Sequence, residues 1–118
     1  MAQVVASGSR LLYISTKPEP DTKGLHKQYR QYDSRVRAHA VKLAKAAPNA
    51  PPPVVMIDSY GGFKDLGNPN SLYNRDRLHL SNKGYAKWEK WAKLALADPD
   101  SLCIEWRSGT CVQLRPGP

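Results

Sequence analysis

The five residues 54–58, VVMID, decide the fold class that the sequence predicts. They form an uninterrupted apolar run that ends in an aspartate, with no alternation of polar and apolar side chains. Such a run is typical of a strand in a parallel sheet covered on both faces, since each face then needs apolar side chains. We therefore expect a buried strand here. Asp58 at its carboxyl end is better interpreted as a turn residue than as a catalytic one.

The residues before this strand predict a second strand and a helix. Residues 11–15, LLYIS, are apolar and favour a strand, and the prolines at 18 and 20 cannot continue its ladder. Between the two strands, apolar residues recur at the three- and four-residue spacing of a helix. This stripe consists of Leu25, Tyr29, Tyr32, Val36, Ala40, Leu43 and Ala47. The order strand–helix–strand predicts a right-handed βαβ unit and hence an α/β protein.

The residues after the strand predict a long loop and a second amphipathic helix. Residues 59–78 are rich in Gly, Asn and Pro, and a loop of that length in a compact domain is often functional. Within it, residues 60–63, YGGF, could shape a substrate loop or form a plain turn. Ser81 or Asn82 can cap the following helix. Its apolar face consists of Tyr85, Trp88, Trp91, Ala92, Ala95 and Leu96, of which the two tryptophans are interpreted as core residues.

The last residues, 98–118, predict a tail that contains a small hairpin. Residues 102–106 and 110–114 can pair across the turn between them, which would place Cys103 opposite Cys111. The two thiols could then form a disulfide, or stay free in a reducing compartment. Two cysteines alone cannot provide a four-ligand metal site. The sequence therefore predicts neither a metal nor a cofactor.

Composition limits the possible partners. The length allows one small domain, and no apolar run approaches the roughly 18 residues that a membrane span needs. No signal peptide is evident at the N-terminus, and localisation stays open. The net charge of +8 favours acidic partners such as nucleic acid, although a lysine-rich solvated surface explains it more simply. Because aromatic residues are not interleaved with the basic ones, nucleic acid is not the favoured partner.

Asp76 and His79, within residues 73–88, YNRDRLHLSNKGYAKW, form the candidate catalytic pair. At a spacing of three residues, a tight turn can place the carboxylate against the imidazole Nδ1 and leave Nε2 facing a substrate. A histidine held in this way is the base that activates a nucleophile in many hydrolases. The short Asp-x-x-His pattern alone is not specific. It becomes more specific because a predicted strand and a long loop precede it and a helix begins after it. The alternative is an N-terminal capping pair with no chemistry.

The same segment resembles the last conserved block of the SGNH/GDSL hydrolases. The pattern of that family is D-x-x-H-x-x-x-x-G-Y, often followed by a tryptophan. The matching residues are Asp76, His79, Gly84, Tyr85 and Trp88. The resemblance covers about residues 10–97. It implies a partial flavodoxin-like three-layer sandwich with a short parallel sheet in residues 1–97, followed by the hairpin tail in 98–118. It also implies an ester hydrolase with His79 as general base and Asp76 as the residue that orients it.

Other blocks of that family have no counterpart here. The Gly-Asp-Ser block with the nucleophile, the second-block glycine and the Gly-x-Asn-Asp block are all missing. Ser7-Gly8-Ser9 is the nearest serine–glycine run, but it precedes the wrong strand. We therefore expect a truncated domain that is inactive alone and acts on an ester only when the missing half is supplied. A two-stranded sheet would leave bare edges, through which the chain could form a homo-oligomer. The alternative functions are a basic binding module for nucleic acid or protein, and a non-catalytic interaction domain.

Overall fold

A computed structural model describes residue 3 and residues 6–97, 103–107 and 110–114. Of the last two strands it describes the backbone and the side chain of Gln113. The protein is mixed α/β, as the sequence predicts. Its elements in chain order are β1 (Leu11–Ile14), the 3₁₀ helix η1 (Pro20–Leu25), α2 (His26–Ala46), β2 (Val54–Ile57), α3 (Ser59–Asp65), the 3₁₀ helix η2 (Asn70–Leu72), α4 (Asn82–Ala97), β3 (Cys103–Arg107) and β4 (Thr110–Leu114).

The strands form one sheet in the order β1-β2-β4-β3. The predicted parallel pair is present, with Leu11 opposite Val54 and the register continuing to the strand ends. The expectation of a two-stranded sheet is wrong, because β4 pairs in parallel with the other edge of β2. Strand β1 lies at the end of the order, so its outer edge has no partner among the described strands.

The predicted hairpin is present, but the expectation that Cys103 lies opposite Cys111 is wrong. Strands β3 and β4 pair antiparallel, with Cys103 opposite Leu114 and Cys111 opposite Trp106. The register shifts twice along β3, between Cys103 and Trp106, so counting outward from the turn does not give the partner of Cys103. Such irregularities place two residues of one strand against one of the other.

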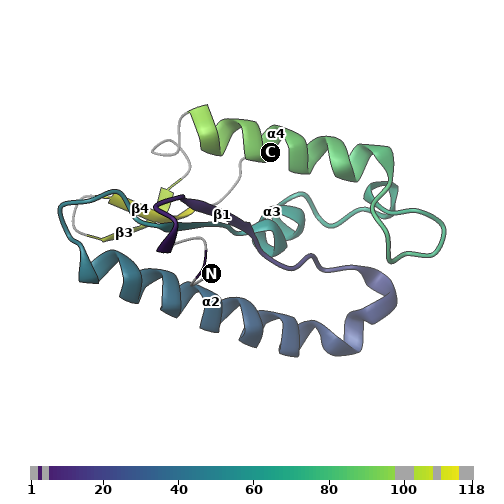
Figure 1. The fold of residues 1–118 in the computed structure, drawn as a ribbon. Coiled ribbons are helices and arrows are strands. Elements are labelled where there is room, and N and C mark those ends of the chain that lie inside the picture. The colour runs from purple at the N-terminus through teal and green to yellow at the C-terminus, as the bar shows by residue number, and fades with distance from the viewer. Residues whose placement is uncertain (1–2, 4–5, 98–102, 108–109, 115–118) are drawn as a thin grey trace.

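Helices lie on both sides of the sheet (Figure 1). Helix α2 covers one face, and α4 lies along the other. The four side chains of β2 are all buried. Because side chains alternate across a strand, Val55 and Ile57 face the α4 side, and Val54 and Met56 face α2. The apolar run that predicts a doubly covered strand is thus explained by the two helical layers.

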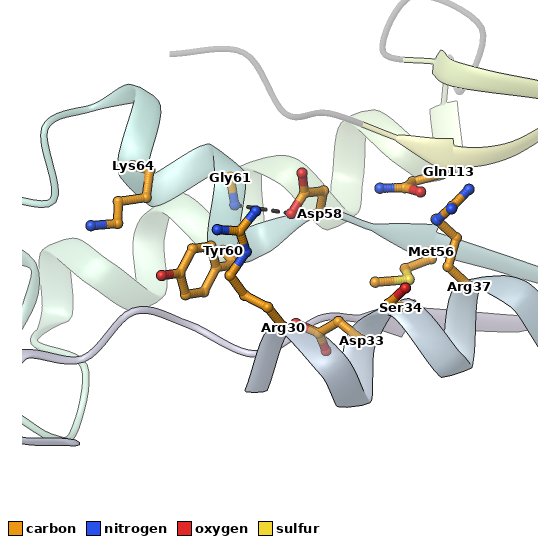
Figure 2. A pocket seen from close by; sticks show the side chains of 10 residues that line it. All are labelled: Arg30, Asp33, Ser34, Arg37, Met56, Asp58, Tyr60, Gly61, Lys64 and Gln113. Atoms are coloured by element: carbon orange, nitrogen blue, oxygen red, sulfur yellow. Dashed lines mark hydrogen bonds between the residues drawn. The ribbon is translucent and has the colours of Figure 1, made fainter. Parts of the chain in front are cut away.

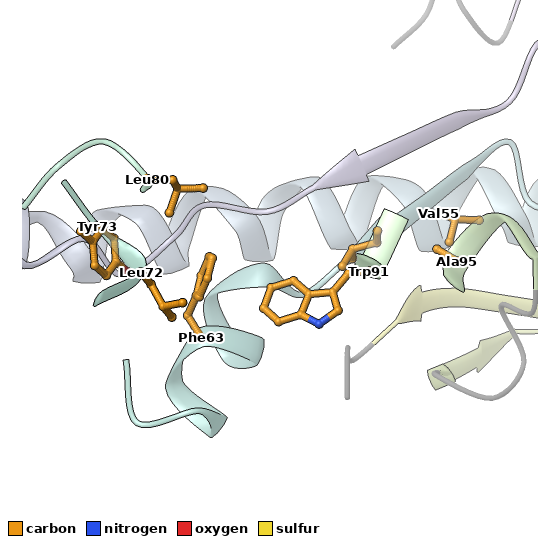
Figure 3. Packing of buried hydrophobic residues seen from close by; sticks show 8 residues of the cluster. Val55, Phe63, Leu72, Tyr73, Leu80, Trp91 and Ala95 are labelled. Atoms are coloured by element: carbon orange, nitrogen blue, oxygen red, sulfur yellow. The ribbon is translucent and has the colours of Figure 1, made fainter. Parts of the chain in front are cut away.

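The main hydrophobic cluster lies on the α4 side and continues beyond the sheet into the loop before α4 (Figure 3). Trp91 of α4 and Phe63 of α3 are fully buried, with ring centroids 5.1 Å apart. Phe63 also lies 6.2 Å from the ring of Tyr73. Leu72 and Leu80 complete this end of the cluster. The prediction that Trp91 is a core residue is confirmed, and the loop that precedes α4 is packed onto the core.

The buried face of helix α2 agrees only in part with the predicted stripe: Ala40 is buried as predicted, and Tyr29, Val36 and Leu43 are half-buried. Leu25 and Tyr32 are exposed, while Asp33, which the stripe omits, is buried. The Asp33 carboxylate accepts hydrogen bonds from the Thr16 backbone N–H at 3.1 Å and from the Thr16 hydroxyl at 2.5 Å. Burial raises the pKa of this carboxyl, and the bonds from Thr16 counteract the rise. The helix is therefore oriented partly by a polar anchor, which hydrophobic periodicity does not detect.

The predicted loop 59–78 contains two helical segments, α3 and η2, so its interpretation as a structureless loop is wrong. The Asp58 side chain caps α3 by accepting a hydrogen bond from the Gly61 N–H at 2.9 Å. Asp58 is therefore a capping residue, in line with its non-catalytic interpretation. In the described part of the chain, none of the helices is both long enough and apolar enough to cross a membrane.

Candidate active site

The candidate pair lies on the turn 74–79, which projects from the core. An isolated antiparallel bridge joins Tyr73 to Leu80 at its base, and the Asn74 N–H donates to the His79 carbonyl at 2.9 Å. The side chains of Tyr73 and Leu80 are both buried in the main cluster. The turn is therefore fixed at its base by apolar packing, although its tip is exposed.

The Asp76 carboxylate organises the turn from within. Its Oδ1 accepts hydrogen bonds from the backbone N–H groups of Leu78 and His79, each at 3.0 Å. This is the local side-chain-to-backbone bonding by which aspartate stabilises turns. Arg77 adopts a left-handed conformation, with φ at 57°, and its N–H donates to the Asn74 carbonyl at 2.9 Å. Asp76 therefore stabilises the turn through one of its two oxygens. It does not cap helix α4, which begins at Asn82.

The second carboxylate oxygen holds the histidine. Asp76 Oδ2 lies 2.6 Å from His79 Nδ1. The hydrogen bond from the imidazole, followed by those from the two backbone amides, lowers the pKa of Asp76 to about 2. At neutral pH the carboxylate is ionised and can only accept, so Nδ1 must carry the proton of this bond. In the neutral imidazole, Nε2 is then the unprotonated nitrogen. The geometry predicted from the three-residue spacing is present.

The pair is open to solvent. The side chain of His79 is 67% exposed and that of Asp76 is 46% exposed. In the described part of the chain, no residue forms a hydrogen bond with His79 Nε2. That nitrogen can therefore reach a group brought in by a substrate or by another polypeptide segment.

Gly84 sets the approach of α4 to this turn. A Cβ at this position would lie 2.2 Å from the Leu72 carbonyl oxygen and 2.9 Å from Leu80 Cδ2. The same Leu72 oxygen accepts a hydrogen bond from the Ser81 N–H at 3.0 Å. Ser81, one of the two predicted caps, also accepts the Gly84 N–H at 3.3 Å through its hydroxyl. The glycine in the sequence pattern is thus a steric requirement for seating the helix beside the turn.

The serines at the strand ends are occupied by structural hydrogen bonds. Ser15, after β1, accepts the Tyr60 N–H at 3.2 Å, and Ser59, after β2, accepts the Trp88 indole N–H at 2.7 Å. Both serines are buried. No described serine hydroxyl forms a hydrogen bond with His79. The sequence predicts Trp88 as a core residue, and its role in joining α4 to α3 through Ser59 carries no local sequence signal.

A hollow separate from the Asp76–His79 turn lies between α2, α3 and the carboxyl end of β2 (Figure 2). It encloses about 520 Å³ and is lined by both cationic and acidic side chains. Arg30 lies over the ring of Tyr60, with its guanidinium carbon 5.6 Å from the ring centroid. The carboxylates of Asp33 and Asp58 accept the hydrogen bonds described above. Sequence reasoning missed this hollow, because it forms only when separate segments of the chain pack together.

A metal centre finds no support in the described residues, since no three His, Cys, Asp or Glu side chains there gather as a metal site would require. Comparison of the chain with protein-family models, with curated proteins and with solved structures gives no match. The interpretation of the Asp76–His79 turn therefore depends on its own residues and geometry.

Proposed function

We propose that this chain is the C-terminal part of an SGNH/GDSL-type ester hydrolase domain with a flavodoxin-like three-layer fold. In this proposal His79 is the general base and Asp76 orients it. The observation that carries the proposal is the 2.6 Å contact between His79 Nδ1 and Asp76 Oδ2. A carboxylate that only caps the turn needs Oδ1 alone. Because Oδ2 binds the imidazole as well, Asp76 fixes the tautomer and the orientation that a general base requires.

The proposed chemistry follows from that tautomer. Nε2 accepts the proton of a serine hydroxyl while the serine oxygen attacks the carbonyl carbon of an ester. The same proton is then given to the departing alkoxide, and water hydrolyses the acyl-serine by the same route. Asp76 stays ionised and stabilises the imidazolium that forms in each step. Its lowered pKa supports this role, since the carboxylate remains charged over the pH range in which histidine acts as a base.

The nucleophile and the oxyanion donors are proposed to come from a further polypeptide segment. The sequence contains no Gly-Asp-Ser and no Gly-x-Asn-Asp. The outer edge of β1 offers a place where additional strands could join the sheet, because it has no partner among the described strands. The exposed Nε2 of His79 is then free to meet a serine carried by such a segment.

Two esterase assays with p-nitrophenyl acetate test the proposal. The chain alone should show no turnover above that of a variant with His79→Ala. A fusion that adds an upstream segment with Gly-Asp-Ser, the second-block glycine and Gly-x-Asn-Asp should hydrolyse the ester. His79→Ala should reduce its rate about 10²- to 10⁴-fold, the usual contribution of a general base. His39→Ala, which removes an exposed histidine on α2, is the matched control and should leave the rate unchanged. Turnover that survives His79→Ala would contradict the assignment.

A further inference from the structure

A cationic hollow lies where η1, the end of α3 and the 74–79 turn meet. It encloses about 290 Å³, and its lining includes Lys23 of η1, Lys64 of α3 and Arg77 of the turn. The side-chain amide of Asn70 adds a neutral hydrogen-bond donor. No aspartate or glutamate is among its described lining residues. Cationic residues from three separate elements therefore line one hollow.

These three cations make no ion pair within the described part of the chain. Elsewhere on the surface, lysines do pair where a carboxylate is in reach, as in Lys17–Glu19 at 3.3 Å and Lys93–Glu89 at 2.7 Å. Asp21 and Asp65 follow the lining residues Pro20 and Lys64 in sequence but do not themselves line the hollow. Two further carboxylates that are close in sequence bind other residues. Glu19 binds Lys17, and Asp76, beside Arg77, binds His79. The charge at the hollow is thus available for an external anion.

The backbone around the hollow is held in an unusual conformation. Asn68 and Arg77, with φ at 46° and 57°, are the non-glycine residues of positive φ in the described chain, and both line the hollow together with Gly67 at 80°. Non-glycine residues in this region are sparse and gather at ligand sites. The Asn68 side chain secures the loop by donating to the Pro18 carbonyl at 2.8 Å and accepting the Tyr73 hydroxyl at 2.6 Å.

The hollow of Figure 2 is a less suitable anion site, although it shares Lys64 with this one. Its cations, which include Arg30 and Arg37, are accompanied by the carboxylates of Asp33 and Asp58. An anion would gain less there, since like charge opposes it. The hollow beside η1 has the higher ratio of positive to negative charge.

We propose that the hollow formed by Lys23, Lys64 and Arg77 binds a phosphate group. A guanidinium can hold two oxygens of a phosphate, and the two ammonium groups can balance its double charge. Neither Asp76 nor His79 lines the hollow, so this site does not depend on the proposed hydrolase chemistry. The phosphate could belong to a small phosphomonoester or to the backbone of a nucleic acid.

Amide NMR during titration with inorganic phosphate, exchanged for chloride at constant ionic strength, tests the site. The proposal predicts saturable shifts centred on the amides of Gly67, Asn68, Asn70 and Arg77. Lys64→Gln and Arg77→Gln should each weaken binding about tenfold, as expected for the loss of one charged hydrogen-bonding group. Lys42→Gln on the exposed face of α2 is the charge-matched control and should have no effect. His79→Ala should also leave phosphate binding unchanged, which separates this test from that of the hydrolase proposal.

A second arm with a short single-stranded oligonucleotide distinguishes the two sources of the phosphate. If the source is a nucleic acid, the oligonucleotide binds more tightly than phosphate, and each cation removed lowers the magnitude of the salt slope by about 0.7. If the source is a small phosphomonoester, both probes bind with similar affinity. Either result supports the site. Shifts that stay linear in phosphate, or that weaken equally in Lys42→Gln and Lys64→Gln, would overturn the proposal.

Discussion

Replacing Gly84 by alanine should destabilise the protein through one well-defined clash. The added Cβ would lie 2.2 Å from the Leu72 carbonyl oxygen, and real Cβ atoms do not approach a backbone oxygen so closely. Either α4 or the segment of η2 must move. Leu80, whose Cδ2 would lie 2.9 Å away, is buried in the core and has little space to yield. The strain therefore falls on packed backbone.

The expected cost follows from two opposing terms. Overpacking of this kind costs about 1–3 kcal/mol, and a rigid backbone contact places Gly84→Ala at the upper end. Alanine gains at most about 1 kcal/mol over glycine within a helix. We therefore expect a net loss of about 2 kcal/mol in the free energy of unfolding. For a chain of this size, that loss corresponds to a melting temperature lower by about 8 °C.

Urea unfolding followed by circular dichroism measures this loss, and Gly24→Ala is the matched control. A Cβ at Gly24 meets no atom within 4 Å, so this variant should stay within about 0.5 kcal/mol of the parent protein. The midpoint for Gly84→Ala should fall while the slope with urea is retained. A Gly84→Ala protein as stable as the parent would refute the close packing of α4 against Leu72.

Two further predictions concern buried and exposed carboxylates. Asp33→Ala leaves the Thr16 N–H and hydroxyl without their partner and should lower the free energy of unfolding by about 1–3 kcal/mol. The control Ser34→Ala, on the exposed side of the helix, should change that free energy little. Equal effects of the two variants in chemical denaturation would argue against the polar anchor. Because the folded-state pKa of Asp76 is lowered from 3.8 to about 2, its contribution to stability is present above about pH 4 and is lost as the pH falls toward 2. Asp76→Asn should therefore flatten the stability profile in that acid range, and an unchanged profile would show that His79 and the turn amides do not hold the carboxylate.

The elements predicted correctly are those whose signals are local. The apolar run at 54–57 predicts a strand, and Ser81 predicts a helix cap, each from a few consecutive residues. Both features are found in the structure. Asp76 and His79 belong to the same class, since a three-residue spacing and a turn are enough to bring them together. The helix α3 was missed because its two glycines resemble a turn, whereas the Asp58 cap and the burial of Phe63 stabilise it.

The features that the sequence could not predict depend on contacts between distant segments. The partner of buried Asp33 is Thr16, seventeen residues away, so no helical pattern contains it. The hollow with Lys23, Lys64 and Arg77 likewise unites three elements that are unrelated in sequence. The sequence contains eighteen lysines and arginines, and nothing in it separates these three from the others.

The tautomer of His79 tests the central claim most directly. Nitrogen-15 NMR of the imidazole at neutral pH distinguishes a protonated Nδ1 from a protonated Nε2. The bond to Asp76 Oδ2 predicts that the neutral ring carries its proton on Nδ1, with Nε2 unprotonated, and that Asp76→Asn abolishes this preference. A neutral ring protonated mainly on Nε2, or a tautomer ratio that is unchanged in Asp76→Asn, would contradict the assignment of His79 as a base oriented by Asp76.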